Sequence, residues 1–312
     1  MSSLNYIFGP VNSRRFGLSL GIDAVPAKTC NLNCIYCECG ETETFSYTPS
    51  EYVNAQDIID ELKQVLNSNL VCDYITFSGA GEPLLNSQIG DIIDFIKENY
   101  PQYQIVVLTN AILLSNPEIA QRILKADIVA PSLDASSEDV FRLMTRPYAG
   151  IVFDEYINGL LEFRKIFSGK IFLEIFFVPE INDSFSEVTG LKELCVKLSP
   201  DKIHLNSLDR PGAVKNLPIM SMEKLSEISD LFLPLETEII GNPDLVDAKV
   251  RITDLRASII STVKRRPSTI EDICRVTGKS EGEVSEIVTD LMKANLIEAK
   301  EMERGVFFRI RG

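Results

Sequence analysis

Two patterns of apolar residues alternate along the first two-thirds of the chain. Short, nearly continuous apolar runs, typical of buried strands, lie at residues 18–25, 74–77, 104–108, 128–133, 171–178 and 202–206. Between them, apolar residues recur every three or four positions, as on one face of a helix, at 50–67, 88–99, 117–125, 137–144, 154–167 and 185–198. Alternating strands and helices predict a parallel sheet. About six repeats are fewer than the eight of a closed barrel, so we expect an α/β fold, a partial (β/α)6 barrel.

The last third of the chain has a different pattern. Helical spacing near 221–231 and a possible strand at 236–240 predict a loosely organised connection. Three helices are then expected at 253–265, 269–276 and 280–294, followed by two short strands between 296 and 310. This order resembles a winged-helix domain. We therefore expect a barrel over 1–215, a connecting segment over 216–252 and a winged-helix-like module over 253–312.

Composition places the chain among ordinary soluble proteins. Hydrophobic residues make up 45% of its 312 residues and charged residues 24%, close to the globular average. No run approaches the roughly 20 apolar residues of a membrane-spanning helix. The first residues lack the basic and apolar segments of a secretory signal, so we expect a cytoplasmic protein with no membrane partner.

The charge is strongly and unevenly negative. Residues 1–252 hold 20 basic and 35 acidic side chains, whereas residues 253–312 hold 11 and 10. An acidic body repels a phosphate backbone, which argues against nucleic acid as a partner. The candidate recognition helix at 280–294 is itself net acidic. Docking of a protein or peptide, or a lid over the barrel, is the favoured role for the C-terminal module.

Four of the seven cysteines lie within ten residues: Cys30, Cys34, Cys37 and Cys39. Clustered thiols without an export signal are more often metal ligands or redox groups than disulfides. The first three form a C-x-x-x-C-x-x-C loop after the first predicted strand, and such soft ligands suit an iron–sulfur cluster or zinc. A structural zinc site needs a fourth ligand. Cys39 is too close to Cys37 for the usual zinc spacing, and the single histidine, His204, lies far away in a predicted strand.

This loop resembles the cysteine loop of the radical S-adenosylmethionine (SAM) superfamily. In that superfamily three cysteines hold a 4Fe-4S cluster whose free iron binds SAM, and the reduced cluster cleaves SAM to methionine and a 5′-deoxyadenosyl radical. The resemblance implies Cys30, Cys34 and Cys37 as cluster ligands and a 4Fe-4S cluster and SAM as cofactors. It also implies an electron donor of the flavodoxin or ferredoxin type.

A second motif follows the second predicted strand. The run from Ser78 to Pro83 is similar to the superfamily's G-G-E-P motif, with Ala80 where glycine is usual. The resemblance implies that this stretch contacts the SAM amino group, that polar groups after the third and fourth strands contact its ribose, and that one aromatic lies against its adenine. The cofactor-binding residues so implied are Gly79, Ala80, Gly81, Glu82, Pro83, Asn110, Asp134 and Tyr36. A helix cap or turn is the alternative role for Asn110 and Asp134.

Three residues are candidates for chemistry on the substrate: Glu174, Cys39 and Asn206. Glu174 alternates with phenylalanines in a strand that should be buried, so its carboxylate needs a polar partner, which the barrel interior would provide. Cys39 lies beside the cysteine loop as a bystander or a participant. We expect His204 to be a core histidine with its hydrogen bonds satisfied rather than a catalytic base.

Further stretches narrow the resemblance within residues 5–215. The segments 9–17, 177–183 and 205–211 look like the small Fe-S oxidoreductases grouped with the wyosine-base synthase of tRNA. Unlike that synthase, this chain has no cysteine before Cys30 that could hold a second cluster. Four arginines could bind an anionic substrate or the SAM carboxylate, or form ordinary salt bridges: Arg14, Arg15, Arg146 and Arg210.

The expected function is a radical modification of an unidentified substrate, with a protein, peptide or small molecule favoured. Three alternatives stay open at this point. They are tRNA base modification of the wyosine type, activation of a glycyl-radical enzyme, and a non-enzymatic zinc or interaction module.

Overall fold

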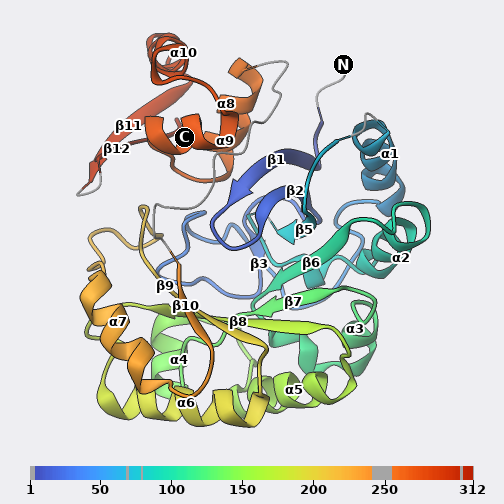
Figure 1. The fold of residues 1–312 in the computed structure, drawn as a ribbon, viewed down its shortest axis with the longest axis vertical. Coiled ribbons are helices and arrows are strands. Elements are labelled where there is room, and N and C mark those ends of the chain that lie inside the picture. Colours follow the sequence, from blue (N-terminus) through green and yellow to red (C-terminus); the bar gives the residue numbers. More distant parts are fainter. Residues whose placement is uncertain (1–3, 68–69, 79, 241–254, 303–304, 312) are drawn as a thin grey trace.

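The structure is a computed structural model that describes residues 4–67, 70–78, 80–240, 255–302 and 305–311. Figure 1 shows a curved sheet with helices against one face and, in orange and red, the C-terminal elements beside β1. No helix in these ranges is both long and apolar enough to span a bilayer.

The main sheet has eight strands in the order β1-β2-β5-β6-β7-β8-β9-β10. Every neighbouring pair is parallel except the β1–β2 hairpin. The strands are β1 (Ile7–Ser13), β2 (Gly17–Asp23), β5 (Tyr74–Ser78), β6 (Gln104–Thr109), β7 (Ile128–Pro131), β8 (Lys170–Phe177), β9 (Lys202–Ser207) and β10 (Thr237–Ile239). The predicted α/β fold with a parallel sheet is confirmed, and its open, curved sheet is consistent with a partial barrel.

Helices connect successive parallel strands. They are α1 (Ala55–Leu66), α2 (Ile89–Asn99), α3 (Pro117–Gln121), α4 (Glu138–Thr145), α5 (Phe153–Ile166), α6 (Phe185–Leu198) and α7 (Met222–Leu231), with 3-10 turns at Pro83–Leu85 and Ile112–Ser115. The start of α1 shows how capping and burial fix such a helix. The Asn54 side chain caps it by accepting from the Gln56 N–H, and Ile58 and Leu62 of its apolar stripe are fully buried.

Strand alternation divides the core into two parts. One face of each strand, for example Ile22, Phe77 and Ile105, packs into the large cluster beneath the helices. The other face forms a smaller cluster that includes Val106 and Ile128 and lines the interior of the curved sheet. Both faces of the sheet are therefore covered, as parallel sheets require.

The turn between β1 and β2 reaches across the interior. Phe16 is 3% exposed and stacks on Phe172 of β8, with ring centroids 6.2 Å apart. Its ring also meets that of His204 on β9 edge-on at 6.0 Å. Because β8 and β9 lie far from β2 in the strand order, the hairpin turn closes the open side of the sheet. The sequence pattern did not predict β1.

The segment expected to be a connection contributes α7 and β10. β10 pairs in parallel with β9, Thr237 opposite Ile203, and so adds a seventh parallel strand. The part of that segment from 241 to 252 lies outside the described residues.

The C-terminal elements are α8 (Leu255–Arg265), α9 (Ile270–Thr277), α10 (Glu281–Lys293), β11 (Ile297–Met302) and β12 (Gly305–Ile310). They match the predicted order of three helices and a hairpin, although residues 253–254 lie outside the described ranges. They share an apolar cluster of their own, which includes Ile259, Val284 and Leu291. The winged-helix comparison stays a prediction.

Candidate cofactor site

The cysteine loop follows β2 at the carboxyl end of the parallel strands. β3 (Thr29–Cys30) and β4 (Thr44–Phe45) pair at its base. Backbone N–H groups of Asn33 and Ile35 donate to carbonyls in the last turn of α4, each at 2.9 Å. The loop is therefore fixed between the end of β2 and the end of α4.

The thiols of this loop lie in an environment that disfavours bare thiolates. Burial raises the pKa of Cys30 to about 12 and that of Cys34 well above its usual value, and each is raised further by the neighbouring thiols. The side-chain hydrogen bond with Cys39 instead lowers the pKa of Cys37. Buried thiolates need a compensating cation, and iron supplies one.

The geometry of the donor set suits a cluster better than a single ion. Within the described ranges, no three His, Cys, Asp or Glu side chains converge closely enough to hold one metal ion. A four-iron cluster is larger than a single ion and keeps its cysteine sulfurs further apart. Three soft sulfur donors on one anchored loop fit that group.

The stretch after β5 packs directly on the cysteine loop. The Lys28 N–H donates to the Ala80 carbonyl, and the Glu82 N–H donates to the Thr29 carbonyl at 3.0 Å. A Cβ atom on Gly81 would overlap the Thr29 carbonyl oxygen, so only glycine allows this approach. Of the motif's other members, Pro83 begins a 3-10 turn, and Gly79 lies outside the described residues.

The buried carboxylate of Glu82 ties this stretch to the end of β6. It is 2% exposed and accepts hydrogen bonds from the Thr109 hydroxyl at 2.7 Å and the Asn110 N–H at 2.8 Å. Burial raises the pKa of Glu82 to about 7, although these hydrogen bonds favour its charged form. The Asn110 side chain then lies 2.6 Å from Asn31 Oδ1 and 3.6 Å from Cys30 Sγ. Two predicted cofactor residues therefore converge beside the first cysteine.

Two further predicted residues contact each other. The Tyr36 hydroxyl donates to Asp134, and the Phe176 N–H donates to the other Asp134 oxygen at 2.7 Å. Tyr36 also stacks on the Phe176 ring at 4.3 Å. Burial raises the pKa of Asp134 to about 7. Tyr36 and Asp134 thus form one wall next to the cysteine loop.

Glu174 has the partners that its position requires. Its Oε2 lies 2.8 Å from Arg15 Nη1, and its Oε1 accepts from the Asn206 side chain at 3.0 Å. The predicted need for a polar partner is confirmed. Sequence reasoning did not identify Arg15 as that partner, because the hairpin that carries it was missed.

His204 is a core residue, as predicted, but the prediction that its hydrogen bonds are satisfied is wrong. It is 1% exposed, and its Nδ1 has no hydrogen-bond partner among the described residues. Burial lowers its pKa to about 4. The ring is therefore neutral at pH 7.

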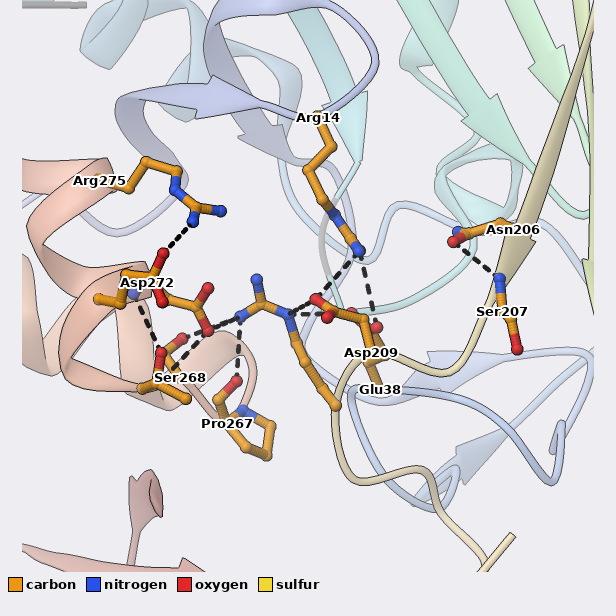
Figure 2. A network of polar contacts seen from close by, with 12 residues as sticks. Arg14, Glu38, Asn206, Ser207, Asp209, Pro267, Ser268, Asp272 and Arg275 are labelled. Carbon is orange, nitrogen blue, oxygen red and sulfur yellow. Dashed lines mark hydrogen bonds and ion pairs between the residues drawn. The ribbon is translucent and has the colours of Figure 1, made fainter. Parts of the chain in front are cut away.

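A charge network surrounds the second half of the cysteine loop (Figure 2). Glu38 lies between Cys37 and Cys39 in the sequence, and Arg14 and Arg210 approach its carboxylate at 3.7 and 3.5 Å. Arg14 also pairs with Asp209 at 3.1 Å. Burial acts to raise the pKa of Glu38, but the arginines hold it below its usual value. Glu38 is therefore a carboxylate held in place by cations.

The ion pairs of the arginines distinguish between binding of an anionic ligand and ordinary salt bridging, the two roles that the sequence left open. Arg14, Arg15 and Arg210 are engaged by the chain's own carboxylates. They form internal ion pairs, and salt bridging rather than anion capture describes them. Arg146 differs: it is an exposed residue with positive φ at the end of α4.

The profile of the radical SAM superfamily matches residues 25–189, a span that contains both the cysteine loop and the Glu82 stretch. The chain belongs to the radical SAM superfamily. Members of this superfamily are enzymes that use a 4Fe-4S cluster and SAM, and the cofactor prediction is thereby confirmed.

Curated relatives of this radical SAM protein carry varied names. A protein of Brachyspira hyodysenteriae named GTPase Obg is 36% identical over 304 residues, which cover 96% of this chain and 44% of that protein. This chain therefore spans less than half the length of that relative. A UPF0026 protein of Synechocystis is 35% identical over 206 residues, 66% of this chain and 76% of that protein.

Solved structures share the fold. TYW1 with a lysine–pyruvate adduct has a TM-score of 0.52 and 16% identity over 72% of this chain and 75% of that one. At this identity the likeness shows the fold and carries no substrate assignment.

Proposed function

We propose that Cys30, Cys34 and Cys37 hold a 4Fe-4S cluster with which this protein cleaves SAM reductively to begin a radical reaction. A cluster held by these cysteines would supply the one electron that breaks the C5′–S bond of SAM, with methionine as the leaving group and hydrogen-atom abstraction from the substrate as the result. The observation that carries the proposal is the convergence of Glu82 and Asn110 on the Cys30 thiol, at the carboxyl ends of adjacent parallel strands.

The roles of the cofactor residues follow from their positions. The stretch from Gly79 to Pro83 presents backbone groups to the SAM amino group, with Glu82 holding that backbone against β6. Asn110 and Asp134 bind the ribose, and Tyr36 lies against the adenine. The Tyr36–Asp134 hydrogen bond of this structure is exchanged for contacts with SAM.

The substrate is expected at the interior polar group of Glu174, Arg15 and Asn206. Glu174 and Asn206 come from the parallel strands β8 and β9, and Arg15 comes from the β1–β2 turn that also carries Phe16. Glu174, Asn206 and Cys39 are the candidates to contact it. A protein, peptide or small molecule is favoured, and the acidic charge of the chain disfavours tRNA.

The proposal also covers the two domains, the location of the enzyme and its electron donor. Residues 1–215 form the catalytic barrel, extended by β10, and residues 253–312 form a winged-helix-like module for a protein or peptide partner. The enzyme acts in the cytoplasm and receives its electron from a flavodoxin-type or ferredoxin-type protein.

The test is reconstitution under anaerobic conditions followed by SAM cleavage. We expect about four irons per chain and 5′-deoxyadenosine on addition of SAM and dithionite. Substitution of Cys30, Cys34 or Cys37 by Ala abolishes both, whereas Cys72→Ala, which removes a thiol two residues before the start of β5, preserves both. A colourless protein with one zinc per chain would overturn the proposal.

A further inference from the structure

Arg210 connects the cysteine loop to the C-terminal module. It follows β9, and its side chain is 5% exposed. On one side its Nε lies 3.5 Å from Glu38 Oε2, and on the other its Nη1 lies 3.2 Å from Asp272 Oδ2, whose side chain is 4% exposed. The same Nη1 donates to the Pro267 carbonyl at 3.1 Å and lies 3.3 Å from the Ser268 hydroxyl. One buried guanidinium thus touches two parts of the chain that are distant in the sequence.

Asp272 is held rigidly on its own side. It is the third residue of α9, and its carboxylate accepts from the Thr269 N–H at 3.1 Å while its own N–H donates to the Thr269 hydroxyl. This capping box fixes the carboxylate relative to α9. A shift of the module therefore moves the charge that faces Arg210.

A second contact fixes the module against the strand that leads into the cysteine loop. Arg265, at the end of α8, pairs with Asp23 at 2.8 Å, and its guanidinium lies over the Phe8 ring at 3.9 Å. Asp23 is the last residue of β2. The module is thus attached at both the entry to the loop and its middle.

Glu38 links the network to the loop cysteines. It lies between Cys37 and Cys39 in the sequence, and its negative charge acts on both thiols. Its negative charge is compensated by Arg14 and Arg210, with Arg266 as a further nearby cation, and the charge of Arg210 is compensated by Asp272 (Figure 2). Removing one charge from such a buried set leaves an uncompensated charge beside the cysteine loop.

We propose that Arg210 is a positioning residue for the iron–sulfur cluster, and that the docked C-terminal module, through Asp272, sets the electrostatic environment in which the cluster is reduced. The inference rests on the proposed cluster at Cys30, Cys34 and Cys37. It assigns the module a part in the cofactor site itself, in addition to any partner that it binds.

Two substitutions with opposite charge effects provide the test. Asp272→Asn keeps the capping oxygen but leaves Arg210 undercompensated, so the reconstituted cluster becomes easier to reduce. Arg210→Gln leaves Glu38 undercompensated, so the cluster becomes harder to reduce. At a fixed solution potential, the ratio of reduced to oxidised cluster changes in opposite directions, each on the order of tenfold. The readout is a potentiometric titration followed by electron paramagnetic resonance.

Matched controls lie on the same helix. Glu271→Gln and Arg275→Gln remove the same charges from an exposed pair and should leave the titration at the wild-type value. Arg210→Lys keeps the charge without the planar fork, so it restores the potential but not the loop geometry.

The outcomes separate the two proposals. If wild-type protein takes up no cluster, the proposed function fails. If the cluster forms but Asp272→Asn and Arg210→Gln shift its potential in the same direction, or match their controls, the role of Arg210 is refuted. If Arg210→Gln alone loses its iron, the Asp272→Asn variant decides the question: the reduction potential of its cluster must still shift toward easier reduction.

Discussion

Replacing His204 with Phe tests the interior of the barrel through proton binding. His204 lies among the rings of Phe16 and Phe172, at centroid distances of 6.0 and 5.6 Å. A phenylalanine ring fits this aromatic cluster, and it removes a buried Nδ1 that has no hydrogen-bond partner among the described residues. We expect His204→Phe to be neutral or stabilising at pH 7, since an unsatisfied buried polar atom costs about 1–3 kcal/mol.

The larger effect is in the pH dependence of stability. Burial and the charge of Arg15 lower the pKa of His204 to about 4 from 6.5, although Glu238 and Glu174 oppose the shift. The unfolded chain therefore binds a proton below pH 6.5 that the folded chain does not bind until about pH 4. Stability from the neutral ring is fully present above pH 6.5 and is lost as the pH falls toward 4. The loss amounts to about 3 kcal/mol at the acid limit.

The assay is urea unfolding of the metal-free protein from pH 4.5 to 7.5, with wild type and His204→Phe compared at each pH. The difference in unfolding free energy should grow in favour of the variant as the pH falls. Because His204 is the only histidine, its imidazole resonances also report its folded-state pKa directly by NMR. A difference that is constant across this range, together with an NMR pKa near 6.5, would refute the reasoning.

Two further substitutions test the packing of the cofactor site. Gly81→Ala forces a Cβ into the Thr29 carbonyl and should destabilise the metal-free protein by about 1–3 kcal/mol. The control Gly282→Ala, in α10 with open space around it, should stabilise the protein by up to about 1 kcal/mol. Equal effects of the two substitutions on thermal unfolding would contradict this account. Tyr36→Phe keeps the stack on Phe176 but removes a hydrogen bond to a buried carboxylate. It should lower the unfolding free energy by about 1–3 kcal/mol with iron content unchanged, and an undiminished stability in urea would count against that hydrogen bond.

The sequence predicted the repeating elements well because burial imposes a period on each of them. The run at 171–178 is apolar since both faces of β8 are covered, and it became Lys170–Phe177. β1 was missed because Gly9 and Pro10 interrupt its apolar alternation where the pairing with β2 is irregular. A bulged edge strand has no clear two-residue period.

In the cofactor site too, the residues marked by local motifs were predicted and the long-range contacts were not. Local motifs located Cys30, Glu82 and Asn110, since each follows a strand that a pattern defines. The pairing of Arg15 with Glu174 could not be predicted, because it joins residues far apart in sequence through the closure of the sheet. Asp272 gives only the local signal of a helix cap, which it is, so its contact with Arg210 becomes visible only once the module is docked.

The hairpin and module contacts also decide when the site is completed during synthesis. Arg14 and Asp209 are separated by 195 positions, and Asp23 and Arg265 by 242. A nascent chain that has released only its first hundred residues already contains the whole cysteine loop and can pair Arg14 with Glu38, yet the contacts that need Asp209, Arg210 and Arg265 cannot form. Contacts of such long range form late and slowly. A cluster bound before these contacts form would lie in a loop without the charges of Arg210 and Asp272 beside it.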